Sequence, residues 1–362
     1  MHIAFLNPQG NFDPKDSYWT EHPDFGGQLV YVKEIAIAME NLGHKVDIIT
    51  RQIIDPEWLE FASSIDHYPD AKNLRILRFP CGPKTFLPKE QLWSYLGTEW
   101  TQNILKYYHQ ENQVPDAFTA HYADGGISAA IISSKTKIPF TFTGHSLGAQ
   151  KLDKLLRTST SLEKLDSQYH FARRIMAERI SMNHASKVIT STKQERFEQY
   201  GHNAYKGAID PADDNRFAVI PPGVNREIFS EVEKPDDKWV DQRINQAIKR
   251  DISQKRLSLP LVLASSRLDE KKNHVGIVKA FAKSEQLQHT ANLAIAVRNL
   301  KDPLRDYHQL NVSERAIFNK IISLIRKSNL WGMVTAFPLN SQKELASAYR
   351  VLAKRKSVFA LT

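Results

Sequence analysis

The interpretation of this chain starts from one stretch, Thr141-Phe142-Thr143-Gly144-His145-Ser146-Leu147-Gly148-Ala149-Gln150-Lys151. Its apolar, aromatic start is typical of a buried strand, and Gly144 then breaks the strand into a loop that carries His145 and Lys151. Ligands of an open α/β sheet bind just beyond the carboxyl ends of its strands. A glycine, an imidazole and an ammonium that leave a strand together therefore indicate a site. For the stretch alone, a loop histidine beside a surface lysine is the alternative.

Strand-like and helix-like segments alternate on both sides of this stretch. Before and after it, strands are predicted at 2–7, 45–51, 74–79, 116–120, 140–143, 187–191 and 217–220, and helices at 28–41 and 161–185. Because alternation of this kind builds βαβ units, it predicts a mostly parallel, doubly wound sheet.

A break in the alternation predicts a domain boundary. It falls at Ile220-Pro221-Pro222-Gly223-Val224-Asn225, and a polar segment then runs to about Ser258. A second alternation follows, with strands at 260–265, 292–297, 333–337 and 357–361 and helices at 274–284, 313–328 and 342–354. We therefore expect two domains, 1–224 and 225–362. Because the last predicted strand has no helix after it to cover it, we expect the second domain to be incomplete.

Composition excludes several classes of protein. No apolar run approaches the roughly 18 residues of a membrane span, and the start lacks a secretory signal. One cysteine, Cys81, cannot form an internal disulfide, which fits the cytoplasm. The formal charge of +9 suits ligands that carry phosphate. The basic residues are spread along the chain without a nucleic-acid-binding motif, so we expect neither a nucleic acid nor a membrane as partner.

Two loops at predicted strand or helix ends are candidate anion sites. Gly26 and Gly27 precede the helix at 28–41, where ligand oxygens can approach backbone N–H groups; a plain turn is the alternative. Arg267 and Lys272 follow the first strand of the second domain, and a guanidinium with an ammonium suits a diphosphate. A solvated basic loop is the alternative for this second pair.

A third candidate is a set of basic residues in the first domain. Lys89, Lys151 and the pair Arg173 and Arg174 belong to it; the two arginines lie about 100° apart on the predicted helix and could reach one edge of a cleft. Tyr122 and Asp124 lie in the segment 121–126. Solvated surface is the alternative for each of these residues.

Taken together, these motifs resemble the sucrose-phosphate synthases of bacteria and cyanobacteria, which belong to the retaining GT-B glycosyltransferases that include sucrose synthase. The motifs occur in family order over the whole chain. They are Asn7-Pro8-Gln9-Gly10, Pro23-Asp24-Phe25-Gly26-Gly27-Gln28, His121-Tyr122-Ala123-Asp124-Gly125-Gly126, Thr143-Gly144-His145-Ser146-Leu147-Gly148, Ile220-Pro221-Pro222-Gly223-Val224, Ser266-Arg267-Leu268-Asp269 with Lys271-Lys272-Asn273, and Phe337-Pro338-Leu339.

The resemblance implies two Rossmann-like domains with a cleft between them, and it implies which residues meet each substrate. UDP-glucose would be the donor, held mainly by the second domain. Its contacts would be Gly26, Gly27, Arg267, Lys272, Phe337 and Leu339. Fructose 6-phosphate would be the acceptor, held by the first domain. Its contacts would be Gln28, Lys89, Tyr122, Lys151, Arg173 and Arg174.

The same resemblance implies a mechanism without a protein nucleophile. Arg267 and Lys272 would stabilise the negative charge that grows on UDP as the anomeric C–O bond breaks. The acceptor hydroxyl would attack from the same face and give its proton to the leaving phosphate oxygen. His145 would position the transferred glucose, and we expect no metal and no other cofactor. The product, sucrose 6-phosphate, points to a sucrose-phosphate phosphatase as a further partner.

The chain departs from the family pattern at its end. Family members continue past the strand matching Ser357 to Thr362 into a glycine-rich loop and two glutamates that hold the donor. Transfer to free fructose, as in sucrose synthase, is one alternative function, and GDP- or ADP-glucose is an alternative donor. A catalytically impaired phosphosugar-binding module is a further alternative, because the glutamate pair is absent.

Overall fold

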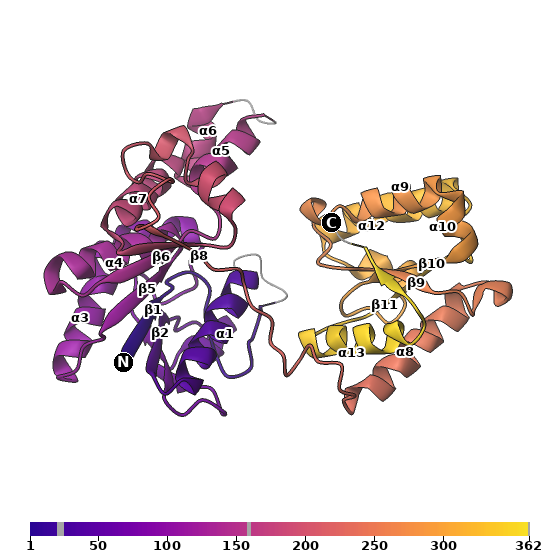
Figure 1. Ribbon diagram of the computed structural model, residues 1–362, viewed down its shortest axis with the longest axis horizontal. Coiled ribbons are helices and arrows are strands. Elements are labelled where there is room, and N and C mark those ends of the chain that lie inside the picture. Colours follow the sequence, from indigo (N-terminus) through magenta and orange to yellow (C-terminus); the bar gives the residue numbers. More distant parts are fainter. Residues whose placement is uncertain (20–24, 158–160, 361–362) are drawn as a thin grey trace. The chain divides into compact units, whose positions relative to one another are not determined.

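The computed structural model describes residues 1–19, 25–157 and 161–360. The chain divides into two compact units, Met1–Gly223 and Val224–Thr362 (Figure 1). This division lies one residue before the predicted boundary, while the ligand roles assigned to the two domains stay predictions. Pro23 and Asp24 of the glycine motif and Leu361 of the last predicted strand lie outside the described residues.

The first unit is built on an eight-stranded sheet in the order β3-β4-β2-β1-β5-β6-β7-β8. Every neighbouring pair is parallel except β3 with β4. The strands are β1 (His2–Leu6), β2 (Lys45–Arg51), β3 (Ile65–His67), β4 (Leu74–Phe79), β5 (Ala117–His121), β6 (Phe140–Thr143), β7 (Lys187–Thr190) and β8 (Phe217–Val219). The main helices are α1 (Gly27–Asn41), α3 (Thr101–Gln110), α4 (Tyr122–Thr136), α5 (Gly148–Leu156), α6 (Leu162–Tyr169) and α7 (Phe171–His184).

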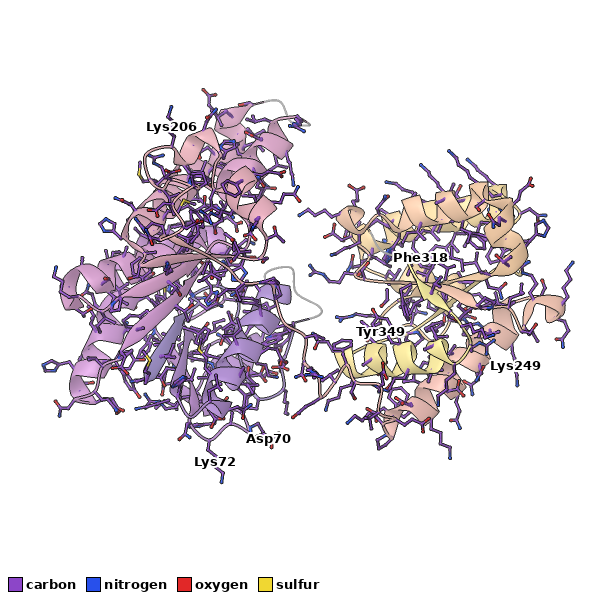
Figure 2. All side chains as sticks on the ribbon, viewed as in Figure 1. Asp70, Lys72, Lys206, Lys249, Phe318 and Tyr349 are labelled. Atoms are coloured by element: carbon purple, nitrogen blue, oxygen red, sulfur yellow. The ribbon has the colours of Figure 1, made fainter. Side chains whose placement is uncertain are left out.

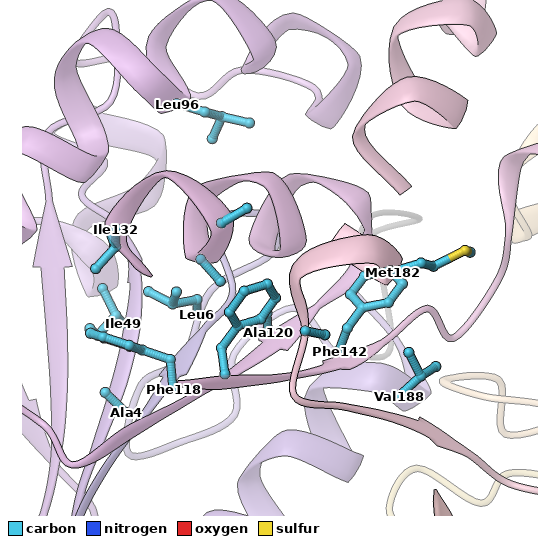
Figure 3. Packing of buried hydrophobic residues seen from close by; sticks show 14 of the residues in the cluster. Ala4, Leu6, Ile49, Leu96, Phe118, Ala120, Ile132, Phe142, Met182 and Val188 are labelled. Atoms are coloured by element: carbon cyan, nitrogen blue, oxygen red, sulfur yellow. The ribbon is translucent and has the colours of Figure 1, made fainter. Parts of the chain in front are cut away.

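Helices cover both faces of this sheet. In β1, Ala4 and Leu6 face one core with residues of α3, α4 and α7, while Phe5 faces a second core with α1. Figure 3 shows part of the first core, where strand side chains such as Phe118 and Phe142 lie under α4 and α7. Because a parallel sheet is apolar on both sides, it is stable only when both faces are covered. The predicted doubly wound architecture is confirmed.

The second unit repeats the arrangement on a parallel four-stranded sheet in the order β11-β10-β9-β12. Its strands are β9 (Leu261–Ser265), β10 (Asn292–Ala296), β11 (Val334–Phe337) and β12 (Val358–Phe359). Its helices are α8 (Asp236–Asp251), α9 (His274–Lys283), α10 (Glu285–Thr290), α11 (Pro303–Asp306), α12 (Val312–Lys327) and α13 (Gln342–Ala353). One core includes α9 and α12, and the other includes α8 and α13. Phe318 of α12 is fully buried, whereas Lys249 of α8 is exposed (Figure 2).

The prediction of one helix over 161–185 is wrong. His170 adopts a left-handed conformation (φ 51°, ψ 46°) and separates α6 from α7. Asp166 stabilises the break, because its backbone oxygen accepts from the His170 N–H and its Oδ1 accepts from the Ala172 N–H. The segment carries no Gly or Pro to mark this turn, so the sequence signal was weak.

The segment after the domain boundary was interpreted only as polar, yet it contains α8. Asp236 and Asp237 lie in the first turn and Lys249 and Arg250 in the last, where each sign of charge suits the helix dipole. The buried side chains of Val240, Ile244, Ala247 and Ile248 recur at helical spacing. This pattern was legible in the sequence.

No helix within the described residues is long and apolar enough to cross a membrane.

Candidate functional site

The loop after β6 is held in an unusual backbone conformation. The Gly144 N–H donates to the Tyr200 hydroxyl at 3.0 Å, and a Cβ at Gly144 would lie only 2.5 Å from Leu147 and 2.7 Å from that hydroxyl oxygen. His145 then adopts a positive φ of 54°. A non-glycine residue in this region is uncommon and persists only when its surroundings enforce it. The predicted site loop is therefore built to present His145.

A buried carboxylate, Glu178 of α7, fastens the other end of this loop. Its two oxygens accept from the Gly148 N–H, which opens α5, at 2.9 and 3.0 Å. Oε1 also accepts from Arg174 Nε at 3.0 Å, and Oε2 accepts from the Tyr205 hydroxyl. Arg174 Nη2 in turn donates to the Ser146 carbonyl. Burial raises the pKa of Glu178, and the nearby Arg174 guanidinium opposes that rise.

Sequence reasoning missed Glu178, Tyr200 and Tyr205, which hold the His145 loop through tertiary contacts. It also expected Arg173 and Arg174 to share one role, and the structure separates them. Arg174 is engaged through Nε and Nη2, whereas the Arg173 side chain is exposed and makes no hydrogen bond or ion pair with the described part of the chain. For Arg174, positioning the loop is thus an observed role, and contact with an acceptor stays a prediction.

The two imidazoles of His121 and His145 are neighbours at the ends of β5 and β6. His121 Nδ1 lies 2.8 Å from His145 Nε2, and the rings stack with centroids 5.1 Å apart. Burial, helped by the neighbouring His145, lowers the pKa of His121 well below its ordinary value, and burial lowers the pKa of His145 to about 3. Both rings are therefore neutral near pH 7. Tyr122 lies beside them, with its ring centroid 5.1 Å from that of His145.

The loop after β1 and the start of α1 meet in the same region of the first unit. Asn7 Nδ2 donates to the Gln9 carbonyl at 2.7 Å, and Gln28 Nε2 donates to Asn7 Oδ1. A Cβ at Gly26 or Gly27 would meet no atom within 4 Å, and neither residue has a positive φ. Packing within the described part of this unit therefore gives no reason for glycine at either position. The open space suits the predicted close approach of a ligand to these glycines.

Gly125 and Gly126, the second glycine pair in the sequence motifs, are required by close packing. A Cβ at Gly125 would lie 2.5 Å from the Leu6 carbonyl oxygen, and one at Gly126 would lie 2.8 Å from the Phe142 ring and clash with the Ser181 hydroxyl. These residues lie inside α4, where it packs closely on the sheet and on α7. Gly125 and Gly126 are packing glycines.

Asp124 is a buried carboxyl group in the first turn of α4. Its Oδ1 accepts from the Gly125 N–H at 3.0 Å and from Gln9 Nε2 at 3.3 Å. Burial raises the pKa of Asp124 to about 6, against the opposing effect of the positive charges of Arg174 and Lys89. Two of the predicted acceptor residues therefore lie close enough to act on one buried carboxylate.

Each of the two lysines predicted to contact the acceptor lies next to a group of the protein. The Lys151 ammonium lies over the rings of Tyr169 and Phe171, 4.5 and 5.9 Å from their centroids. The Lys89 ammonium lies 3.6 Å from a carboxylate oxygen of Glu90. An ammonium over a ring face still has N–H groups that point away from the ring and can donate to an anion. Acceptor contacts of Lys89, Lys151, Tyr122 and Gln28 stay predictions.

In the second unit, the loop after β9 presents the predicted diphosphate residues. Leu268 is buried in the core, while Arg267 and Lys272 on either side of it are exposed. The polar groups of the loop are used locally, since Asp269 Oδ1 accepts from the Lys271 N–H and Asn273 Oδ1 accepts from the Gly276 N–H. The loop thus holds its backbone with its own side chains and leaves Arg267, Lys271 and Lys272 exposed.

A groove of about 840 Å³ lies at the carboxyl ends of β10 and β11, beside α8. Its polar lining includes Trp239, Arg243, Arg250 and Lys301, and the loop after β11 contributes Pro338 and Asn340. Arg243 Nη1 donates to the Pro338 carbonyl at 3.1 Å, and Arg250 Nη2 donates to the Ala336 carbonyl at 2.7 Å. The groove occupies the end of the sheet where α/β proteins bind ligands.

The side chains of Phe337 and Leu339, which the resemblance assigns to the donor, are buried. Phe337 is completely buried and Leu339 is 6% exposed, and both pack in the core with α8 and α13. The donor contacts of Phe337 and Leu339 stay a prediction. The burial of these two side chains anchors the loop after β11, and Phe337, Pro338 and Asn340 all line the groove.

The described residues contain no group of three or more His, Cys, Asp or Glu placed to hold a metal ion. The expectation that activity needs no metal stays a prediction. Cys81 is buried, and burial raises the pKa of its thiol to about 12. Only a thiolate is a strong nucleophile or metal ligand, so Cys81 is an inert structural residue.

Comparisons with known proteins agree on one family. The family model described as the sucrose synthase first GT-B domain matches residues 1–249. A probable sucrose-phosphate synthase of Thermosipho melanesiensis is 45% identical over 362 residues, which are 100% of this chain and 76% of that protein. Probable sucrose-phosphate synthase 2 of Arabidopsis thaliana is 32% identical over 410 residues, covering 99% of this chain and 38% of the plant protein.

The solved structure of sucrose-phosphate synthase from Thermosynechococcus elongatus has the same fold. It matches with a TM-score of 0.65 at 22% identity, over 97% of this chain and 73% of that one. At that identity the likeness supports the GT-B fold alone. The chain spans about three quarters of the bacterial relative and less than half of the plant relative.

Proposed function

The chain belongs to the sucrose synthase family of GT-B glycosyltransferases, and from this premise we propose that it makes sucrose 6-phosphate. The donor is UDP-glucose and the acceptor is fructose 6-phosphate. The bond between the glucose anomeric carbon and the phosphate oxygen breaks, and the acceptor's anomeric hydroxyl oxygen bonds to the same carbon on the same face. The acceptor's proton passes to the leaving phosphate oxygen, and UDP is released.

One observation carries the choice of a phosphorylated acceptor. Lys89 lines a small pocket with Gln9 and Gly10 after β1, and Arg174 Nη2 donates to the Ser146 carbonyl after β6. The positive charges of both residues act to lower the pKa of Asp124. Cations that gather around the carboxyl ends of β1, β5 and β6 suit a dianionic phosphate better than a neutral sugar. Lys151, on the helix that follows the His145 loop, is a further cation assigned to the acceptor.

The donor is assigned to the second unit on charge and position. Arg267 and Lys272 face outward after β9, where they are available to stabilise the negative charge that develops on UDP. The groove beside β10 and β11 is large enough for a nucleoside. His145 is neutral near pH 7, which suits a hydrogen-bonding role toward the sugar rather than a charge on it.

The acceptor is tested by calorimetry on the full chain. Fructose 6-phosphate and fructose are titrated separately with UDP present, and we expect binding of the phosphorylated sugar only. Lys151→Ala should weaken it by about tenfold, the usual effect of one charge-assisted hydrogen bond. Lys154→Ala, an exposed lysine on the same helix, is the matched control and should change nothing. Equal binding of fructose would favour the sucrose synthase reaction instead.

Transfer itself is tested by incubating the chain with both substrates and identifying sucrose 6-phosphate by mass spectrometry. GDP-glucose and ADP-glucose in place of UDP-glucose test the donor. The product is a phosphate monoester, so we propose that a sucrose-phosphate phosphatase consumes it. The cytoplasm is the proposed location. Binding of fructose 6-phosphate without turnover would favour the phosphosugar-binding module.

A further inference from the structure

Two polar side chains of β5 and one of the loop after β6 form a continuous chain of contacts in the first unit. Thr119 Oγ1 lies 3.3 Å from His121 Nε2, and His121 Nδ1 lies 2.8 Å from His145 Nε2. Phe5 stacks on the His121 ring, with the two ring centroids 5.7 Å apart and an angle of 5° between the ring planes. Tyr31 meets the His145 ring edge-on at 5.1 Å. Neither ring can rotate away without losing these contacts.

The protons of the two rings are coupled by this geometry. A neutral imidazole has one N–H and one lone pair, so the bond between the rings needs one donor and one acceptor. If His121 carries its proton on Nδ1, His145 must accept at Nε2 and carry its own proton on Nδ1. If His121 carries it on Nε2, His145 must carry its proton on Nε2. The tautomer of His121 therefore decides whether Nδ1 of His145 is a hydrogen-bond donor or an acceptor.

The Thr119 hydroxyl favours the first arrangement. Among the described residues, the only hydrogen-bond partner of this hydroxyl is His121 Nε2. When it donates to Nε2, its proton is satisfied; when it accepts instead, that proton has no acceptor in the described part of the chain. Thr119 is only partly buried, so in the second arrangement its proton would have to be satisfied by water instead of by the protein. His145 Nδ1, the end of the chain of bonds, makes no hydrogen bond within the described residues.

We propose that His121, oriented by Thr119, is a positioning residue that fixes His145 as an N–H donor at Nδ1. This inference rests on the proposed function for its consequence, because the donated hydrogen bond would be made to an oxygen of the transferred sugar. His121 itself is 1% exposed and touches no ligand in this role. Its effect on transfer is exerted through His145.

The tautomer is measured directly, without substrate, by nitrogen-15 NMR of the full chain labelled at histidine. The His145 signals are identified by their loss in His145→Gln. We expect a neutral ring with its proton on Nδ1. In His121→Asn, the side-chain amide can still donate to His145 Nε2, so this tautomer should persist. In His121→Phe, which keeps the ring stack on Phe5, it should be lost.

Activity gives a second readout. The kcat for transfer should fall about tenfold in His121→Phe and by less in His121→Asn, while the midpoint of thermal unfolding controls for folding. A proton on Nε2 of His145 in the unmodified protein, or an unchanged His145 tautomer in His121→Phe, would overturn the proposal. If the unmodified protein transfers no glucose, the proposed function fails, and the NMR comparison still decides the role of His121.

Discussion

Both carboxylate oxygens of Glu178 lie within hydrogen-bonding distance of the Gly148 N–H, at 2.9 and 3.0 Å. This contact joins the middle of α7 to the first turn of α5. With Tyr200 bound to the Gly144 N–H on the other side, the loop that carries His145 is held at both ends. A carboxylate of the protein thus occupies the helix N-terminus that a ligand anion could otherwise use.

Glu178→Gln should lower the free energy of unfolding by about 1–3 kcal/mol, because only one atom of the amide head group can accept. Arg174 loses its ion partner in the same variant. Urea denaturation at pH 7 measures the change. The exposed Glu231→Gln is the control and should stay within about 0.5 kcal/mol of the unmodified protein. Equal stabilities of the two variants would contradict the role assigned to Glu178.

Asp47→Asn should destabilise the first unit by about 3–5 kcal/mol, since it breaks a buried ion pair. Asp47 is fully buried and accepts from Arg75 Nε at 2.7 Å, from Tyr108 at 2.8 Å and from His2, whose Nε2 lies 2.7 Å away. Burial alone would raise the pKa of Asp47, but these hydrogen bonds outweigh it and lower the pKa to about 2.

The pH dependence of the same variant gives an independent check. Because the pKa of Asp47 is lower in the folded state, its stabilisation is complete above the unfolded value of about 3.9 and is lost as pH falls toward about 2. Urea midpoints at several acidic pH values should therefore fall more steeply for the unmodified protein than for Asp47→Asn. Parallel slopes would show that Asp47 does not titrate as described.

Asp124→Asn should stabilise the protein near neutral pH, whereas Asp47→Asn should destabilise it. Burial raises the pKa of Asp124 to about 6, so the folded state holds this proton more tightly than the unfolded state. The resulting stabilisation is present below about 4 and is lost as pH rises through 6. The variant should gain up to about 3 kcal/mol relative to the unmodified protein at pH 7.5 and nothing at pH 4. A gain that does not depend on pH would exclude the titration of Asp124 as its cause.

Gly27→Ala and Gly126→Ala form a matched pair. At Gly126 the added methyl group would clash with Ser181 and Phe142, so the free energy of unfolding should fall by about 1–3 kcal/mol. At Gly27 it meets no neighbour among the described residues, so stability should hold or rise by about 0.5–1 kcal/mol. Only Gly27→Ala should weaken UDP-glucose binding while the fold stays intact, as calorimetry would measure. Unchanged affinity in that variant would remove Gly27 from the donor site.

Arg267→Ala should lower the affinity for UDP by about 10- to 100-fold, the effect of losing one charge-assisted contact with a phosphate. Arg267→Lys should recover only part of it, because an ammonium cannot make the paired contacts of a guanidinium. Lys279→Ala, an exposed lysine on α9, is the control. Calorimetric titration with UDP compares the three variants, and equal losses in Arg267→Ala and Lys279→Ala would indicate a nonspecific charge effect.

Local pattern was enough to predict most of the elements that position the site. The strands at 45–51, 74–79 and 140–143 have the predicted bounds, because each is short and rich in aliphatic, β-branched or aromatic residues. The strand predicted before the loop after β9 and the helix predicted after it also place Arg267 and Lys272 correctly at a strand's carboxyl end. The break at His170 and the helix α8 were missed, the first because a left-handed histidine leaves little mark in sequence.

The sequence by itself determined the alternation of strands and helices, the two-domain division and the family, since these depend on hydrophobic spacing and on motifs in a fixed order. Only the tertiary structure decided what each motif residue does. It separated the open glycine Gly27 from the packing glycine Gly126, engaged Arg174 with Glu178, and set His121 against His145. The reason is that burial and hydrogen-bond partners come from residues distant in sequence, and these decide protonation, conformation and reach.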